Sequence, residues 1–243
     1  MILMHLGLLT RTTSIHAPEM RPLKVGKFRE KSRKRLFPAK LFLAIMTETE
    51  IIFAFILLGY LIGSFPSGLV YTRLSGMEDI RTIGSGNIGA TNVLRTGNKK
   101  IALGTLLTDM LKGIATILVA KHFLSDNEAA FVGMAAFLGH IYPIWLKFKG
   151  GKGVATYIGV LAGLSIWAVT GFALIWLAMA WLFRYSSLAA LTASLAAPVI
   201  FYLQPDSQNI AVISLVMTFI VFFKHLENIQ RLWKGEETKI GNT

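Results

Sequence analysis

One polar stretch, residues 83–95, concentrates glycines and hydrogen-bond donors in an otherwise apolar sequence. It reads Ile-Gly-Ser-Gly-Asn-Ile-Gly-Ala-Thr-Asn-Val-Leu-Arg. Glycines such as Gly86 let backbone N–H groups approach an anion closely, and N–H groups at a helix start form an anion-binding nest. Arg95 adds a planar guanidinium suited to phosphate. Hydroxyl or amide donors come from four side chains: Ser85, Asn87, Thr91 and Asn92. The stretch predicts a phosphate site, with a flexible loop carrying helix caps as the alternative.

A second glycine-rich stretch, Lys149-Gly150-Gly151-Lys152-Gly153, places two lysines among three glycines just before an apolar run. This composition predicts a second anion site. Neither stretch completes a nucleotide-binding motif. Residues 84–89 match G-x-G-x-x-G without a surrounding strand–helix–strand unit, and Val154 stands where a Walker A loop has Ser or Thr. The nearby His140 is expected to be a packed or interfacial histidine rather than a catalyst.

Two further groups of polar residues flank these stretches. On a helix, His225, Asn228 and Arg231 share one face because they are three residues apart. The alternative for that segment is a basic helix lying at the membrane interface. Asp109 and Lys112 fall inside an apolar run, where charges are expensive and usually paired or functional. We expect a structural pair that supports the site, with direct catalysis as the second interpretation.

The elements that must position these residues are membrane helices. The chain is 53% hydrophobic and 16% charged, with a mean hydropathy of +0.57, whereas soluble domains are about 45–50% apolar and about 25% charged. Apolar residues form long runs near the ~20 residues that cross a bilayer. They predict an all-α polytopic membrane protein with seven transmembrane helices, at roughly 51–71, 101–123, 129–146, 154–168, 169–183, 186–203 and 210–224. We divide the continuous run 154–183 near Gly163–Ser165 or Gly171.

Lysine and arginine are distributed unevenly among the loops. The loops 72–100 and 147–153 and the C-terminal tail are basic, whereas residues 125–128 and 204–209 contain no Lys or Arg. The positive-inside rule then predicts a cytoplasmic C-terminus, an N-terminus outside, and all the polar stretches on the cytoplasmic side.

Residues 1–45 contrast with the remainder. They contain ten Lys and Arg but only two acidic residues, Glu19 and Glu30. So basic a segment should resist transfer to the outside, where the alternation places it. We therefore expect residues 46–243 to form the membrane domain and 1–45 to be a basic extension, disordered or absent from the native protein. The segment lacks interleaved aromatics, so no nucleic-acid partner is expected.

Taken together, the motifs resemble those of the bacterial acyl-phosphate:glycerol-3-phosphate acyltransferases. The resemblance covers about residues 46–237 and is carried by six segments: Gly63-Ser64-Phe65-Pro66-Ser67-Gly68, Ser85-Gly86-Asn87-Ile88-Gly89-Ala90-Thr91-Asn92, Asp109-Met110-Leu111-Lys112-Gly113, Gly139-His140-Ile141-Tyr142-Pro143, Lys149-Gly150-Gly151-Lys152-Gly153-Val154-Ala155-Thr156 and His225-Leu226-Glu227-Asn228-Ile229-Gln230-Arg231-Leu232. It implies a seven-helix enzyme of the bacterial inner membrane whose active site faces the cytoplasm. The enzyme would transfer an acyl group from acyl phosphate to the 1-hydroxyl of glycerol 3-phosphate. The products would be lysophosphatidic acid and inorganic phosphate, in the first acylation of phospholipid synthesis.

The resemblance also implies roles for individual residues. Catalytic roles fall to Ser85, Asn87, Thr91, Asn92, His225 and Asn228. Phosphate binding falls to Arg95, Lys152, Lys149, Gly86, Gly151 and Gly153. Asp109, Lys112, His140 and Arg231 would give structural support. No cofactor and no metal are expected. The expected partners are acyl phosphate, glycerol 3-phosphate, membrane lipid and the soluble enzyme that makes the acyl phosphate.

The residues themselves fit this chemistry. Two phosphorylated reactants need two anion sites, and an activated anhydride needs no cysteine nucleophile, which the chain does not have. A transporter of anionic solutes is the main alternative, but it favours basic residues near mid-membrane. An acyl-CoA-dependent enzyme would need His and Asp separated by four residues, and no histidine has that partner. An alcohol phosphotransferase would need clustered aspartates, and the four present are widely spread.

Overall fold

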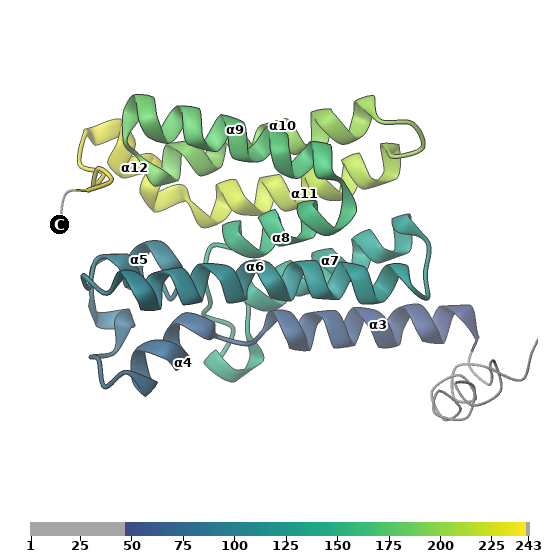
Figure 1. Cartoon of the computed structure of the whole chain (residues 1–243), viewed down its shortest axis with the longest axis horizontal. Coiled ribbons are helices and arrows are strands. Elements are labelled where there is room, and N and C mark those ends of the chain that lie inside the picture. Colours follow the sequence, from purple (N-terminus) through teal and green to yellow (C-terminus); the bar gives the residue numbers. More distant parts are fainter. Residues whose placement is uncertain (1–46, 242–243) are drawn as a thin grey trace, which may run out of the picture. The chain divides into compact units, whose positions relative to one another are not determined.

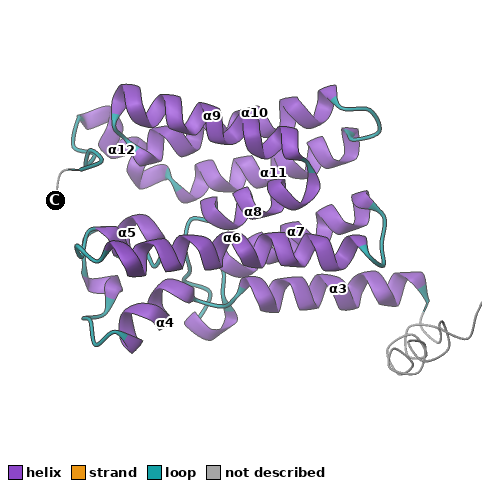
Figure 2. Cartoon of the chain, viewed as in Figure 1, coloured by secondary structure: helices purple, strands orange, loops and turns teal. Residues whose placement is uncertain are grey.

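A computed structural model describes residues 47–241; the predictions for residues 1–45 lie outside this part. The described residues form helices and turns without a strand (Figure 2), which confirms the all-α prediction. The helices in chain order are α3 (Glu48–Gly63), α4 (Ser67–Leu74), α5 (Ala90–Leu94), α6 (Lys99–Lys121), α7 (Asp126–Ile141), α8 (Val154–Leu164), α9 (Ile166–Phe183), α10 (Ser186–Leu203), α11 (Gln208–Lys224) and α12 (Leu226–Lys234), with short 3-10 turns η1 (Ile80–Thr82) and η2 (Ile144–Leu146).

Within residues 47–241, five helical segments are long and apolar enough to cross a bilayer, namely Glu48–Leu74, Lys99–Lys121, Asp126–Leu146, Ile166–Phe183 and Ser186–Leu203. The bent pair α11–α12 makes at most a sixth. At 11 residues, α8 is about 16 Å long and does not span a bilayer of about 30 Å by itself. The protein is therefore a multi-pass membrane protein, with fewer full-length spans than the seven predicted.

The division of residues 154–183 shows where the sequence prediction succeeded. The helix breaks at Ser165, within the expected Gly163–Ser165, and the Ser165 hydroxyl accepts from the Ala168 N–H to cap α9. The predicted bounds 154–168 and 169–183 were wrong by a few residues, because a serine cap ended the apolar run earlier than hydropathy alone indicates.

Small residues bring the helices into close contact. A Cβ on Gly63 of α3 would lie 1.9 Å from the Ala136 carbonyl of α7, and one on Gly139 of α7 would lie 2.2 Å from the Tyr60 carbonyl. Close backbone approach of this kind is how membrane helices gain packing energy without a hydrophobic driving force. The result is that α7 is held firmly against α3, and its C-terminal end, which carries His140, is fixed in place.

The polar segments gather toward one end of the helices. Figure 1 shows α4, α5 and α12 at that end, while the α6–α7 and α10–α11 turns lie at the other. The helices thus bring together segments far apart in the sequence, as the distribution of basic loops predicted.

Candidate active site

Residues 83–95, here called the Ser85 loop, fold around one buried side-chain amide, that of Asn92. This side chain is 1% exposed and donates from Nδ2 to the carbonyls of Ile80 at 3.0 Å and Ile83 at 2.9 Å. Its Oδ1 accepts from the Ser85 backbone N–H at 3.1 Å. Gly84, at a φ of +57°, supplies a left-handed turn that a side chain would strain. Both donors and the oxygen of Asn92 are therefore used inside the loop, so Asn92 positions the loop, and the catalytic role predicted for it stays a prediction.

Three other side chains of this loop keep their donors free. Within residues 47–241, no hydrogen bond or ion pair engages the side chain of Asn87, Thr91 or Arg95. The Arg95 guanidinium lies over Gly84, whose added Cβ would be 3.2 Å from Nη1. A half-buried guanidinium without a carboxylate partner is costly unless an anion completes it. This end of the loop is thus suited to bind phosphate.

The Lys149–Gly153 loop is hydrogen-bonded to the C-terminal end of α7. The N–H groups of Gly150 and Gly151 donate to the carbonyls of Ile141 at 3.0 Å and His140 at 3.1 Å. Gly153, at a φ of +85°, packs so closely that a Cβ would lie 2.3 Å from the Phe137 ring. These glycines are therefore needed for close approach.

The anion-nest hypothesis requires correction for two glycines. The Gly151 N–H bonds to His140, and the Gly86 N–H donates to the Ile83 carbonyl at 3.0 Å, so neither is free for phosphate. The first N–H groups of α8 have no side-chain cap and remain available beside Lys152. Lys149 is exposed, and its phosphate-binding role stays a prediction.

Lys152 connects the three polar segments. Its Nζ donates to Asn228 Oδ1 in α12. Burial lowers the pKa of the Lys152 ammonium, and the positive charges of Arg231 and Arg95 lower it further, whereas the carboxylates of Glu237 and Glu227 oppose this shift in part. The influence of Arg95 means that the Ser85 loop and the Lys152 loop lie near each other at the same end of the helices. Lys152, Arg95 and Asn228 thus frame one polar site.

The histidine at the junction of α11 and α12 has a defined orientation. His225 is 4% exposed, and its Nδ1 lies 2.8 Å from the Val221 carbonyl. A carbonyl only accepts, so Nδ1 carries the hydrogen and Nε2 of the neutral ring is the acceptor. His225 precedes the first residue of α12, so the single helix face predicted for His225, Asn228 and Arg231 does not include it; His225 and Asn228 are nevertheless both buried, and Asn228 contacts Lys152.

Sequence reasoning missed Glu237, in the tail after α12. Its side chain is 9% exposed and accepts from Asn228 Nδ2 at 2.6 Å, Ser187 Oγ at 2.7 Å and Arg231 Nε at 2.7 Å. Burial alone would raise the pKa of the Glu237 carboxyl, but these hydrogen bonds outweigh it and hold the pKa below its usual value. Glu237 fixes the Asn228 amide with its oxygen toward Lys152. No sequence signal separates it from its neighbour Glu236.

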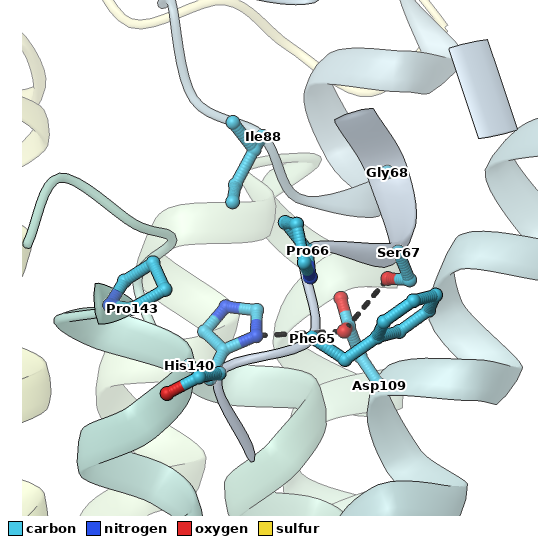
Figure 3. A pocket seen from close by; sticks show the side chains of 9 residues that line it. Phe65, Pro66, Ser67, Gly68, Ile88, Asp109, His140 and Pro143 are labelled. Atoms are coloured by element: carbon cyan, nitrogen blue, oxygen red, sulfur yellow. Dashed lines mark hydrogen bonds and ion pairs between the residues drawn. The ribbon is translucent and has the colours of Figure 1, made fainter. Parts of the chain in front are cut away.

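Buried charged residues form a cluster around Asp109, and Figure 3 shows this carboxylate with Ser67 and His140. Lys112 Nζ is 2.8 Å from Asp109 Oδ1, so the predicted pair forms, and both side chains are at most 5% exposed. Ser67 Oγ donates to the same carboxylate at 2.8 Å, and His140 Nδ1 is 3.5 Å from it. A small pocket opens beside them, lined by Ser64, Phe65, Pro66, Ser67, Gly68, Ile88, Asp109, His140 and Pro143. Residues 47–241 hold no group of three side chains suited to a metal ion.

Comparison with known proteins assigns the family. Residues 53–235 match the family described as glycerol-3-phosphate acyltransferase. The chain belongs to the glycerol-3-phosphate acyltransferase family. The glycerol-3-phosphate acyltransferase of Mesorhizobium japonicum is 60% identical over 183 residues, 75% of this chain and 93% of the relative. That of Brucella canis is 55% identical over 186 residues, 76% and 92% of the two chains.

A solved structure supports the same assignment. Crystal structures of PlsY, an integral membrane glycerol 3-phosphate acyltransferase, match in two forms. The glycerol 3-phosphate form gives a TM-score of 0.75 at 38% identity, covering 78% of this chain and 96% of that one. The lysophosphatidic acid form gives 0.73 at 37% identity, with coverages of 78% and 95%. The multi-pass helical fold and the acyltransferase class are thereby established.

Proposed function

We propose that the protein transfers a fatty acyl group from acyl phosphate to the 1-hydroxyl of glycerol 3-phosphate, giving lysophosphatidic acid and inorganic phosphate. The observation that carries this proposal is the placement of Arg95 and Lys152. They come from two separate loops, neither is paired with a carboxylate, and Arg95 is close enough to influence Lys152. Two cations to which no carboxylate is directly bonded suit a reaction in which both substrates carry phosphate.

The chemistry requires only positioning and electrostatic stabilisation. The 1-hydroxyl oxygen forms a bond to the acyl carbonyl carbon, and the bond from that carbon to the phosphate oxygen breaks. Phosphate leaves with the electron pair, and the hydroxyl proton passes to a phosphate oxygen. His225 Nε2 is an acceptor that can orient the hydroxyl, and the free donors of Asn87 and Thr91 can stabilise the developing oxyanion. Because phosphate is a good leaving group, the reaction proceeds without a cysteine nucleophile.

Three features of the chain have defined places in this proposal. Arg95 and Lys152 hold the two substrate phosphates, while Ser85 faces the reacting atoms beside them. Glycerol 3-phosphate enters from water, whereas the acyl tail lies among the helices in lipid, and the soluble enzyme that makes the acyl phosphate is a partner. Residues 46–243 form the catalytic membrane domain, and 1–45 are a basic extension to it.

We place the site at the cytoplasmic face of the bacterial inner membrane, with the residues before α3 outside and the C-terminus in the cytoplasm. The support is the Lys and Arg content of the loops on the α4, α5 and α12 side. In this topology α8 carries the chain from the cytoplasmic side to the turn at Ser165, although the helix is shorter than a bilayer is thick. The cysteine-free chain permits a direct test, in which Thr82→Cys and Asn127→Cys are labelled in intact and opened cells. Thr82→Cys should react only after opening; the reverse pattern contradicts the orientation.

Acyl transfer itself is tested with purified protein, palmitoyl phosphate and glycerol 3-phosphate. We expect inorganic phosphate and lysophosphatidic acid to appear in equal amounts, and palmitoyl-CoA to give no product. Lysolipid formed from palmitoyl-CoA but not from palmitoyl phosphate would reject the acyl-phosphate donor. Uptake of glycerol 3-phosphate into protein-loaded vesicles without acyl transfer would instead support the transporter alternative.

A further inference from the structure

His140 lies between the buried charges of α6 and the Lys149–Gly153 loop. Its Nδ1 is 2.9 Å from Lys112 Nζ and 3.5 Å from Asp109 Oδ1, and the residue is 6% exposed. An ammonium group only donates, so Nδ1 accepts and Nε2 carries the hydrogen of the neutral ring. The inner edge of the imidazole is therefore held in one orientation by the ion pair.

The outer edge of the same ring touches the loop. A Cβ built on Gly151 would lie 2.0 Å from His140 Nε2, 2.9 Å from Cε1 and 3.0 Å from Cδ2. The imidazole thus fills the space that any side chain at position 151 would need. The Gly151 N–H also donates to the His140 carbonyl at 3.1 Å. The loop is consequently held by both the backbone and the ring of one residue.

The ion pair that holds His140 is itself anchored from three helical segments. Lys112 of α6 also donates to the Phe65 carbonyl at 3.1 Å, in the break between α3 and α4. Ser67 at the start of α4 donates to Asp109, and His140 belongs to the last turn of α7 (Figure 3). A ring braced by several packed elements is a rigid reference point for the loop that lies against it.

The contact with Gly151 matters because the next residue is Lys152. A displacement of Gly151 carries Lys152 with it, and the lysine must stay aligned with Asn228, to which its Nζ donates. The backbone immediately beyond is fixed as well, since Gly153 packs against Phe137. The location of the ammonium group therefore depends on where the imidazole edge places the loop.

We propose that His140 is a positioning residue: its imidazole transmits the location of the Asp109–Lys112 ion pair to Gly151 and so sets where Lys152 presents its charge to a substrate phosphate. This inference rests on the proposed function and adds to it. His140 acts through Lys152 and does not touch the substrate. Its loss should therefore weaken binding of one phosphorylated substrate more than it slows the chemical step.

The variant His140→Asn separates this role from simple stability. The asparagine keeps an oxygen near the position of Nδ1, so Lys112 retains a hydrogen-bond acceptor. It lacks the Nε2 side of the imidazole ring, which touches Gly151. We expect KM to rise about tenfold for either glycerol 3-phosphate or palmitoyl phosphate, with kcat and the other KM changed less than about threefold. The melting temperature should stay within a few degrees. The matched control is His122→Ala, at an exposed histidine beyond the far end of α6, which should leave both KM values unchanged.

A double-mutant cycle tests the contact itself. Gly151→Ala should be severe in the wild-type background, because its methyl group meets His140 Nε2, and mild in His140→Asn, where space has been made. If the two effects multiply instead, the ring does not position the loop. Unchanged KM values in an active His140→Asn enzyme, or an activity loss matched by the loss of folded protein, would also overturn the inference.

A binding readout keeps the inference distinct from the proposed function. Inorganic phosphate should raise the melting temperature of the wild-type protein, and His140→Asn should need about ten times more phosphate for the same rise. Absence of acyl transfer by wild-type protein would reject the proposed function but leave this comparison in force. Equal phosphate dependence of the two proteins would reject the positioning role, whatever the reaction.

Discussion

Replacing Lys152 by methionine removes one charge from the site while keeping a side chain of similar length. The wild-type ammonium is half-buried, donates to Asn228, and lies near Arg95 and Arg231. In Lys152→Met the loop should keep its shape, because that shape depends on the Gly151 bond to His140 and on Gly153 packing, not on the lysine. The change therefore isolates the electrostatic contribution of a single cation.

The magnitude follows from the surroundings. A cation contact at a desolvated site contributes about 2–4 kcal/mol to transition-state stabilisation. Since about 1.36 kcal/mol corresponds to a factor of ten, kcat/KM should fall by roughly two to three decades. The neighbouring Lys149 is exposed, so Lys149→Met should reduce kcat/KM by less than about tenfold.

The assay is phosphate release from palmitoyl phosphate with varied glycerol 3-phosphate, using purified proteins with matched melting temperatures. Lys149→Met is the control for loss of one positive charge on the same loop. If Lys152→Met retained more than about a tenth of wild-type kcat/KM, or if the two variants lost activity equally, Lys152 would not be the cation that holds a substrate phosphate.

Three other predictions follow from individual contacts. Burial and nearby cations lower the pKa of Lys152, so this lysine should lose its charge, and the enzyme its activity, at a pH below the ~10.4 expected of a free lysine. In Lys152→Arg the fall of kcat/KM on the alkaline side should shift to higher pH, because arginine keeps its charge. Gly153→Ala should destabilise the protein by about 2–4 kcal/mol, because it adds left-handed strain and a clash with Phe137; thermal unfolding measures the loss. Glu237→Ala should lower both activity and melting temperature, since it leaves the buried Asn228 amide unpaired, whereas exposed Glu236→Ala should change neither.

The membrane fold was largely predictable because lipid imposes long apolar helices. The break at Ser165 was also within reach, since serine is a common helix cap. Hydropathy could not show that α8 is too short to span, because the apolar run continues into α9 without a charged residue. The length of an apolar run shows only that the segment can lie in lipid, and it does not show where the chain turns within the run.

The candidate site was predicted in outline, and less well in the function of each residue. Residue type and spacing indicated which side chains meet, as the contact between Lys152 and Asn228 illustrates. They could not show that Asn92 uses all its hydrogen-bonding groups within its own loop. Glu237 was out of reach, because its partner Ser187 is 50 residues away and only the folded chain brings them together.

Glycines in residues 83–95 and in the Lys149–Gly153 loop show that a glycine needed for close packing cannot be told from one that binds phosphate by sequence alone. The Gly86 and Gly151 N–H groups bond within the protein, and a side chain at position 151 would collide with His140. A substitution at Gly151 would therefore weaken phosphate binding without removing any phosphate ligand, because it displaces Lys152. A loss of phosphate binding in such a glycine variant would therefore reflect displacement of the neighbouring cation. The site is then best understood as two cations without a bonded carboxylate, Arg95 and Lys152, whose backbone is held in place by close packing.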